Sequence, residues 1–303
     1  MEAQIVVSDI LDLKNRFKNI TIWKKGGQRA PHKPLLALYA LGRCIRGEGR
    51  LVSFADVDRH LRNLLEEFGP ARKSLHPEYP FWRLCNDHLW ELTNAENVVL
   101  RKGNTDARKS ELLKHDVHGG FPQDVYDELC QDSRLFAEVV HHLLSTNFPD
   151  SIHEDILQSV GIDLTENLTV VGKRDPLFRE HVLRAYEYQC AVCGYNVRVG
   201  NSLVGLEAAH IKWHQAGGPD NETNGIALCA LHHKLFDRGA FTISENMVLQ
   251  VSRNAHGTTG FKEWLKNYHG KPLTTPQAPT YYPTPNYVHW HIREVFKGPA
   301  RFV

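Results

Sequence analysis

Two pairs of metal-ligand residues constrain the fold of this chain more than any other feature. Cys190 and Cys193 form one pair with a two-residue gap, and Cys229 and His232 form a second pair with the same gap. This gap lets both side chains of a pair reach one ion, and three thiolates with one imidazole complete a tetrahedral zinc site that has no open position. The sequence therefore predicts a structural Zn²⁺ that fastens a helix around residue 232 to the loop before a strand.

The other cysteines and the terminal sequence indicate the compartment. Of the six cysteines, Cys44, Cys85 and Cys130 are scattered through the first half, as expected of ordinary buried thiols. The N-terminus lacks the order of a secretory signal, and no apolar run approaches the roughly 20 residues of a membrane span. We expect a cytoplasmic protein without membrane contact, in which a CxxC pair binds metal rather than forming a disulfide. Four unmetallated core residues are the alternative.

Length and composition favour two domains. The chain has 303 residues, 42% of them hydrophobic, which is enough for two cores of ordinary size. The polar stretch TENLTVVGKRDP at 165–176 predicts the boundary. We expect one domain over 1–165, a linker over 166–175, and a second domain over 176–303 whose proline-rich tail wraps around it.

The first domain is predicted to be mostly helical. PLLALYALGRCIR at 34–46 has apolar residues at helical spacing, and Ser53 is the expected N-cap of the helix that follows it. FWRLCNDHLWEL at 81–92 predicts two short strands around Asn86-Asp87. Further helices are expected over 124–146 and 151–160. Helix, helix and β-hairpin resemble a winged-helix arrangement, which is common among nucleic-acid-binding domains.

Charge is distributed unevenly along a nearly neutral chain. The net charge is +1, yet ten Lys or Arg stand between Lys14 and Arg50 against one acidic residue, Glu48. Such a segment is typical either of a phosphate-binding face or of a solvated helix surface. Charge alone does not decide between the two.

A second set of chemistry-bearing residues is interleaved with the zinc ligands. His210 ends the predicted strand LEAAH, Asn224 ends the loop that follows, and His233 stands next to His232 on the predicted helix ALHHKLFDR. Neighbouring helix residues point about 100° apart, so His233 is available to a second site. The order is a strand with His, a loop with Asn and a helix with His.

This order, with the zinc-type ligands around it, resembles the HNH nucleases, whose core is a ββα-metal fold. The resemblance covers about residues 176–250. It implies that His210 is the general base that activates water and that His233 is a ligand to one catalytic ion, Mg²⁺ or Mn²⁺. It also implies that Asn224 either ligates this ion or orients the base.

One position departs from the HNH pattern. Many of these enzymes have Asp or His immediately before the base, as a metal ligand, and this chain has Ala209 there. Glu207 lies two residues earlier on the same strand face and is the expected substitute ligand, with Asp220 behind it. His214, near the loop, is predicted to be a solvated histidine, with a phosphate contact as the alternative.

Two short motifs in the first domain carry a second resemblance. The motif APHKPLL at 30–36 begins a helix, where backbone N–H groups and positive charge favour phosphate binding. The motif YPFWRL at 79–84 adds aromatic residues and the basic residue Arg83. By composition alone, both are also typical of a helix entry and of core packing. Followed by an HNH module, they resemble the sulfur-binding domain of McrA-type, modification-dependent (type IV) restriction endonucleases, over roughly residues 10–165.

This resemblance implies a partner, double-stranded DNA in which sulfur replaces a non-bridging phosphate oxygen. A pocket walled by the Pro80 ring and the Tyr79 face would accept weakly hydrated sulfur, whereas oxygen would lose its hydration there at a cost of about 1–3 kcal/mol. The residues implied to contact the DNA are Arg29, His32, Lys33, Tyr79, Pro80, Trp82 and Arg83.

The expected fold class is thus α+β: a mostly helical, winged-helix-like domain with a β-hairpin, and a zinc-stapled ββα-metal domain. The expected function is endonucleolytic cleavage of phosphorothioate-modified DNA. One alternative is an HNH restriction endonuclease that reads methylated or otherwise modified bases, or a plain sequence. Another is a non-catalytic DNA-binding protein. One HNH site cuts one strand, so a double-strand break requires a homodimer or two successive binding events.

Overall fold

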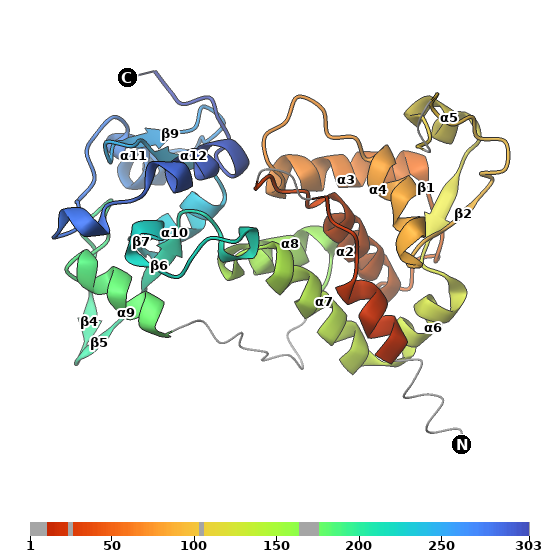
Figure 1. The fold of residues 1–303 in the computed structure, drawn as a ribbon, viewed down its shortest axis with the longest axis horizontal. Coiled ribbons are helices and arrows are strands. Elements are labelled where there is room, and N and C mark those ends of the chain that lie inside the picture. Colours follow the sequence, from red (N-terminus) through yellow and green to blue (C-terminus); the bar gives the residue numbers. More distant parts are fainter. Residues whose placement is uncertain (1–10, 24–26, 103–105, 164–175, 303) are drawn as a thin grey trace. The chain divides into compact units, whose positions relative to one another are not determined.

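The computed structural model describes two compact units (Figure 1). Unit 1 contains described residues 11–23, 30–102, 106–147 and 153–163, and unit 2 contains described residues 27–29, 148–152 and 176–302. The linker expected over 166–175 lies outside the described residues. Unit 2 therefore includes two short segments from the first half of the sequence.

Unit 1 is built around one buried helix, α2 (His32–Ile45), whose side chains Leu35, Leu36, Leu38 and Leu41 are all buried. A helix that is apolar on every side must be covered on every side. The helices that contact α2 are α3 (Phe54–Phe68), α4 (Glu78–Arg83), α6 (Gln123–Gln131), α7 (Ser133–Asn147) and α8 (His153–Val160).

Local capping explains two helix boundaries in unit 1. Ser53 caps α3 as predicted, since its Oγ accepts a hydrogen bond from the Asp56 backbone N–H at 3.1 Å. The helix predicted over 124–146 is instead two helices, α6 and α7. Asp132 separates them, because its Oδ1 accepts the backbone N–H groups of Arg134 and Leu135, both at 2.9 Å, and so caps a new helix.

A small antiparallel sheet completes unit 1, in the order β1 (Val52–Ser53), β3 (His118–Gly120), β2 (Glu91–Thr93), with α5 (Lys109–Lys114) between β2 and β3 in the sequence. Of the two strands predicted around Asn86-Asp87, the first was wrong, and the second corresponds only to β2, which begins at Glu91 and pairs with β3. The segment before β2 is α4 followed by a 3₁₀ turn, because Phe81 and Leu84 are buried at a spacing of one helical turn. The unit remains mostly helical, as expected.

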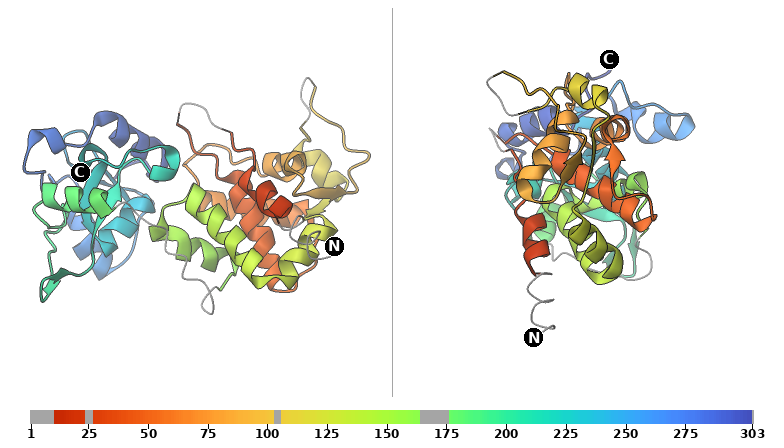
Figure 2. Two further views of the ribbon diagram at one scale, coloured as in Figure 1. Left: turned by 60° about the horizontal axis from the view of Figure 1, so that its bottom comes forward. Right: turned by 90° about the vertical axis from the view of Figure 1, so that its right-hand side faces the viewer.

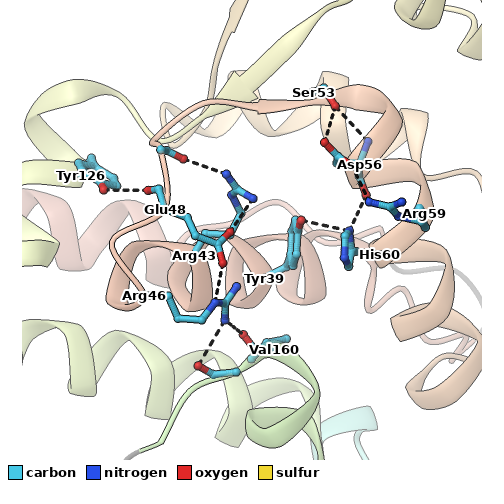
Figure 3. Close-up of polar contacts among 12 residues, drawn as sticks. Tyr39, Arg43, Arg46, Glu48, Ser53, Asp56, Arg59, His60, Tyr126 and Val160 are labelled. Atoms are coloured by element: carbon cyan, nitrogen blue, oxygen red, sulfur yellow. Dashed lines mark hydrogen bonds and ion pairs between the residues drawn. The ribbon is translucent and has the colours of Figure 1, made fainter.

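Much of the basic segment between residues 14 and 50 makes structural contacts, some of which Figure 3 shows. Arg43 and Arg46 both bind the Glu48 carboxylate, at 2.7 Å each. The hydrogen bond from Arg46 lowers the pKa of Glu48. Arg46 also donates to the Val160 carbonyl at the end of α8. Arg50 pairs with Glu91 on β2. These cations hold helices and strands together rather than forming a free phosphate-binding face.

Two of the cysteines in unit 1 depart from the expectation of scattered buried thiols. Cys44 Sγ on α2 lies 2.6 Å from Cys130 Sγ on α6, and Cys130 is exposed. Burial, together with Cys130, raises the pKa of Cys44 to about 12. The two thiols therefore form a pair.

Unit 2 has the predicted ββα core. Strands β6 (Leu206–His210) and β7 (Gly225–Cys229) pair antiparallel from Leu206–Cys229 to His210–Gly225, and α10 (Ala230–Asp237) follows directly. Helix α9 (Pro176–Ala185) packs on both strands. Glycine is required at 225, because a Cβ there would lie 2.2 Å from Val182 Cγ2 on α9.

Further short elements surround this core. The β4–β5 hairpin (Arg198–Val199, Ser202–Leu203) projects from the rest of unit 2 in Figures 1 and 2. Beyond α10 come β8 (Phe241–Ile243), β9 (Leu249–Val251), α11 (Thr259–Trp264) and α12 (Pro285–Glu294). Within the described residues, no helix is long and apolar enough to cross a membrane.

The proline-rich tail follows the surface of unit 2, as expected, but it is not wholly extended. Its backbone N–H groups at Thr274 and Thr284 donate to the carbonyls of Ala191 and Thr223. Pro285 then stands in the first turn of α12, where its fixed φ and missing N–H suit a helix start.

Candidate active site and DNA-reading site

The four predicted zinc ligands are brought together in unit 2. The ligand atoms of Cys190, Cys193, Cys229 and His232 all lie within 4.8 Å of one another. Three are buried and Cys193 is half-buried. Such a set can hold a metal ion, and no second group of three or more His, Cys, Asp or Glu side chains is assembled in this way among the described residues.

The orientation of His232 suits metal binding. Its Nε2–H donates to the Trp264 carbonyl at 2.7 Å, which leaves Nδ1 facing Cys229 Sγ at 3.2 Å and Cys190 Sγ at 3.6 Å. A ring N–H held by a carbonyl fixes the tautomer of a ligating histidine. The ring edge packs against Phe241 and Tyr268.

His233, the next residue of α10, faces a different set of side chains. Its Nδ1 lies 2.6 Å from Glu207 Oε2 on β6, and its Nε2 lies 3.1 Å from Asp237 Oδ2 at the end of α10. The His233 side chain is 5% exposed and that of Glu207 is 38% exposed. Burial opposes charge on His233, but the two carboxylates outweigh it and raise its pKa to about 9.

Asp237 is a site residue that the sequence analysis missed. It is buried, and besides His233 it accepts hydrogen bonds from Trp213 Nε1 at 2.9 Å and from the Ser151 hydroxyl. Burial opposes its ionisation, but the interaction with His233 prevails and lowers the pKa of Asp237. The available signal was its position four residues after His233, on the same helix face.

His210 lies at the end of β6 in a very different environment. Its Nε2–H donates to Asp220 Oδ1 at 2.7 Å, and its ring stacks on Phe178 of α9 with the centroids 4.0 Å apart. Burial lowers the pKa of His210 below its usual value of 6.5, although Asp220 acts in the opposite direction. A neutral ring that donates from Nε2 has its lone pair on Nδ1. His214, predicted to be solvated, has a side chain 65% exposed.

Asn224 is fully buried and its amide bonds to the backbone of the preceding loop. Its Oδ1 accepts from the Lys212 N–H at 2.9 Å, and its Nδ2 donates to the carbonyls of Lys212 and Pro219 at 2.9 and 3.0 Å. Gly218 lies in the same loop, where a Cβ would come within 1.8 Å of the Lys212 carbonyl oxygen. Asn224 thus closes the loop that connects His210 to its partner Asp220.

The two reader motifs meet in unit 1. His32 Nε2 donates to the Leu75 carbonyl at 3.0 Å, before α4, and Lys33 Nζ lies 2.5 Å from Asp87 Oδ2, just after it. Burial lowers the pKa of His32, which favours the neutral ring. The first turn of α2 is therefore tied to both flanks of α4.

Tyr79, on α4, lies among cations. The guanidinium carbons of Arg83 and Arg101 are 4.8 and 5.1 Å from its ring centroid, and Arg101 also donates to its hydroxyl at 3.1 Å. Arg83 binds the buried Asp106 with two hydrogen bonds, at 2.6 and 2.5 Å, while its own side chain stays 45% exposed. The sequence analysis missed Arg101, because no local pattern links it to Tyr79.

The other predicted reader residues have different positions. Pro80 is buried and Trp82 is half-buried on the same helix. Arg29 belongs to unit 2, where its guanidinium carbon lies 3.8 Å from the Trp213 ring centroid and its Nη1 donates to the Glu294 carbonyl at 2.9 Å. The structure therefore groups Arg29 with unit 2 and not with α4, which belongs to unit 1.

Comparison with known proteins identifies both halves of the chain. The family model described as the ScoMcrA-like DNA sulfur-binding domain matches residues 10–165, and the model described as HNH endonuclease matches residues 190–244. Comparison with curated proteins gave no significant match.

Three solved structures are among those similar to this chain. The sulfur-binding domain of ScoMcrA complexed with phosphorothioated DNA is 23% identical, with 49% of this chain and 94% of that chain covered and a TM-score of 0.45. The sulfur-binding domain of SprMcrA complexed with phosphorothioated DNA is 25% identical, with 50% of this chain and 94% of that chain covered and a TM-score of 0.42. The type IV phosphorothioation-dependent restriction endonuclease ScoMcrA is 19% identical, with 64% of this chain and 40% of that chain covered and a TM-score of 0.42.

The sulfur-binding model spans about half of the chain, and the HNH model follows it over the ββα core and the Cys₃His cluster. The chain therefore belongs to the ScoMcrA-like DNA sulfur-binding domain family and joins this domain to an HNH nuclease domain, which makes it an endodeoxyribonuclease of the McrA type.

Proposed function

We propose that this endonuclease recognises phosphorothioate-modified double-stranded DNA through residues 1–165 and hydrolyses nearby phosphodiester bonds with the HNH domain over 176–303, residues 166–175 being the linker. The observation that carries the proposal is the succession of a sulfur-binding model and an HNH model along one chain. Since one HNH site cuts one strand, double-strand cleavage would require two chains or two binding events.

His210 is the proposed general base. Its lowered pKa keeps the ring neutral at pH 7, and Asp220 holds Nε2–H so that Nδ1 is the nitrogen that takes a proton from water. Asn224 would support this step indirectly, because its hydrogen bonds hold the loop that brings Asp220 to His210. Of the two roles implied for Asn224, its contacts favour orientation over metal ligation.

His233 and Glu207 are the proposed ligands of the catalytic ion. The His233 imidazole nitrogen and the Glu207 carboxylate oxygen lie 2.6 Å apart, on a buried and a partly exposed side chain, and are ligand types that suit Mg²⁺ or Mn²⁺. Such an ion, when bound, offsets the charge that develops on the phosphoryl oxygens and the leaving 3′-oxygen. The Cys₃His cluster is assigned a structural Zn²⁺, because four protein ligands leave no open position.

The proposed sulfur site lies beside α4, where the half-buried Tyr79 and Trp82 provide apolar surface and the buried Pro80 stands next to Tyr79 in the chain. Arg83, His32 and Lys33 are the proposed donors to the neighbouring phosphate oxygens and base edges; they bind Asp106, the Leu75 carbonyl and Asp87, contacts that DNA would have to share or replace. A sulfur is weakly hydrated and loses little on entering such a surface, whereas a phosphate oxygen loses its hydration without full compensation. Arg29, which the sequence also predicts to contact DNA, belongs to unit 2, so it is not assigned to the surface beside α4.

Binding of matched duplexes tests the reader. With EDTA present to stop cleavage, we expect tighter binding to a duplex with one phosphorothioate than to the same sequence without it, by about 5- to 150-fold for a penalty of about 1–3 kcal/mol. Equal affinity would contradict sulfur reading. A preference for a methylated duplex would favour base recognition instead.

A further inference from the structure

We propose that Asp237 is the positioning residue of the catalytic-ion site, and that two short segments of the N-terminal half complete its environment. One segment is the 3₁₀ turn η2 (Asp150–Ile152), which supplies Ser151. The other is residues 27–29, which act through Trp213. The inference rests on the proposed nuclease function, because it concerns the orientation of the ion ligand His233.

The Asp237 carboxylate is held by donors from three different parts of unit 2. Its Oδ1 accepts from Trp213 Nε1 at 2.9 Å, and its Oδ2 accepts from the Ser151 hydroxyl and from His233 Nε2, the latter at 3.1 Å. The side chain is 1% exposed. A buried carboxylate with three donors is both ionised and fixed in orientation.

The orientation of His233 follows from that of Asp237. With Nε2–H directed at Asp237, the ring can only present Nδ1 to Glu207, which is the partly exposed side of the pair. Outer carboxylates that hold the second nitrogen of a ligating histidine set its tautomer and increase its basicity. Asp237 would therefore tune ion binding without touching the ion or the DNA.

Ser151 reaches Asp237 from a segment that is distant in sequence. It lies in η2, between α7 and α8, and η2 packs against α10. Residues 148–152 group with unit 2, although α7 and α8 on either side group with unit 1. The Ser151 hydroxyl is therefore a contribution of the N-terminal half to the ion site.

Trp213 is itself held by residues of the other segment. The Arg29 guanidinium covers the indole ring at 3.8 Å, and Trp290 packs against it edge-on, with ring centroids 5.9 Å apart. Arg29 is anchored by the buried Glu294, whose Oε2 accepts the Arg29 backbone N–H at 3.0 Å. Trp290 Nε1 donates to the Gly27 carbonyl at 2.7 Å. These contacts fix the indole with its N–H toward Asp237.

The arrangement makes the ion site dependent on the chain that continues into the reader. Arg29 stands three residues before His32, at the start of α2, and Ser151 stands two residues before the start of α8. A nuclease domain defined from residue 176 onward would lack both supports. The N-terminal half therefore contributes to ion binding as well as to DNA recognition.

The test measures Mn²⁺ affinity of the full-length, zinc-loaded protein without DNA, by calorimetry or by the electron paramagnetic resonance of free Mn²⁺. S151A removes one donor to Asp237, and W213F removes another while keeping a ring beneath Arg29. We expect each variant to weaken Mn²⁺ binding by about 10-fold, and we expect D237N to weaken it more. S151T, which keeps the hydroxyl, should bind as wild type.

The controls separate positioning from general damage. S145A makes the same substitution on α7, where the Ser145 hydroxyl donates to the His142 carbonyl of its own helix, and it should leave Mn²⁺ affinity unchanged. H233A identifies the binding signal that belongs to this site. Zinc content and circular dichroism report whether each variant folds. If D237N does not fold, the Mn²⁺ affinities of S151A and W213F still test whether Asp237 positions His233.

Two outcomes contradict the inference in distinguishable ways. If S151A and W213F bind Mn²⁺ as tightly as wild type, or if S151T is as weak as S151A, Asp237 is not positioned by these donors. If the wild-type protein itself shows no H233A-sensitive Mn²⁺ binding and cuts no DNA, the proposed nuclease site fails, and the inference fails with it.

Discussion

His210 and His233 have opposite electrostatic environments, and the difference matches two different roles. His210 has one carboxylate partner and an aromatic neighbour, and burial lowers its pKa below 6.5. His233 has two carboxylate partners that raise its pKa to about 9. Pairs of titratable groups with divergent environments are typical of acid–base and ligand assignments in one site. The first therefore suits a base, and the second suits a site that attracts a cation.

Replacement of the base is the simplest residue-scale prediction. H210A should lower the rate of DNA cleavage by about 10²–10⁴-fold and leave DNA affinity within about 2-fold of wild type, because no proton acceptor remains for the water. Single-turnover cleavage and binding in EDTA measure the two effects. H289A is the matched control, since His289 is exposed and pairs with Glu245. Wild-type cleavage by H210A would exclude this base.

The pH profile is the second residue-scale prediction. Because the pKa of His210 is lowered, the unprotonated base predominates above pH 6.5, and the rate should fall only as pH decreases through a value below 6.5. Asp220 acts to raise this pKa, so D220N should move the acid limb to still lower pH while reducing the plateau rate. The measurement is kcat/KM between pH 5 and 8 at saturating Mn²⁺. An acid limb centred well above 6.5 would contradict the assignment.

At the scale of elements, helix α10 joins the closed Cys₃His cluster to the catalytic set through adjacent residues. His232 faces the cluster and His233 faces Glu207 and Asp237. H232A should lose zinc and lower the melting temperature of unit 2 by more than about 10 °C, because a structural zinc contributes several kcal/mol to folding.

H233A is the comparison for that experiment. It should keep zinc and the fold but lose cleavage. Metal analysis, thermal unfolding and cleavage of both variants give the comparison. Retention of zinc by H232A, or loss of zinc by H233A, would reverse the assignment of the two histidines.

Helix α12 makes the stability of unit 2 dependent on pH. His291 is buried against Phe236 of α10, with Thr242 on its Nδ1, and burial lowers its pKa to about 4. The unfolded state binds the proton more readily, so stability is full above pH 6.5 and is lost as pH falls from 6.5 toward 4, by at most about 3 kcal/mol.

His291→Gln should flatten this dependence. Urea unfolding of wild type and variant between pH 4 and 7 measures it. An identical slope for both proteins would show that His291 does not carry the effect.

Prediction from sequence succeeded where a signal was local. The spacing of Cys229 and His232 placed α10, and a serine before an amphipathic run placed the start of α3. It failed at 81–92, because a short apolar run fits a strand or a buried helix equally well, and packing on α2 decides. Asp237 stands four residues after His233, but that spacing alone did not single it out, because its other partners, Ser151 and Trp213, are distant in sequence.

At the scale of the whole molecule, the chain joins a DNA sulfur-binding domain to an HNH nuclease domain. The first half supplies the sulfur-binding domain over 10–165, and the second supplies the HNH motif over 190–244. Residues 27–29 and 148–152, from the first half of the sequence, group with unit 2. DNA recognition is assigned to the first half of the chain, and cleavage to unit 2, which includes these two segments.

Cleavage of two duplexes of the same sequence, with and without a phosphorothioate, tests this account most directly. We predict that the 303-residue chain in Mn²⁺ or Mg²⁺ cuts the modified duplex, leaves the unmodified one intact under the same conditions, and cuts neither in EDTA. H210A should bind the modified duplex without cutting it. Equal cleavage of both duplexes, or cleavage in EDTA, would contradict the account.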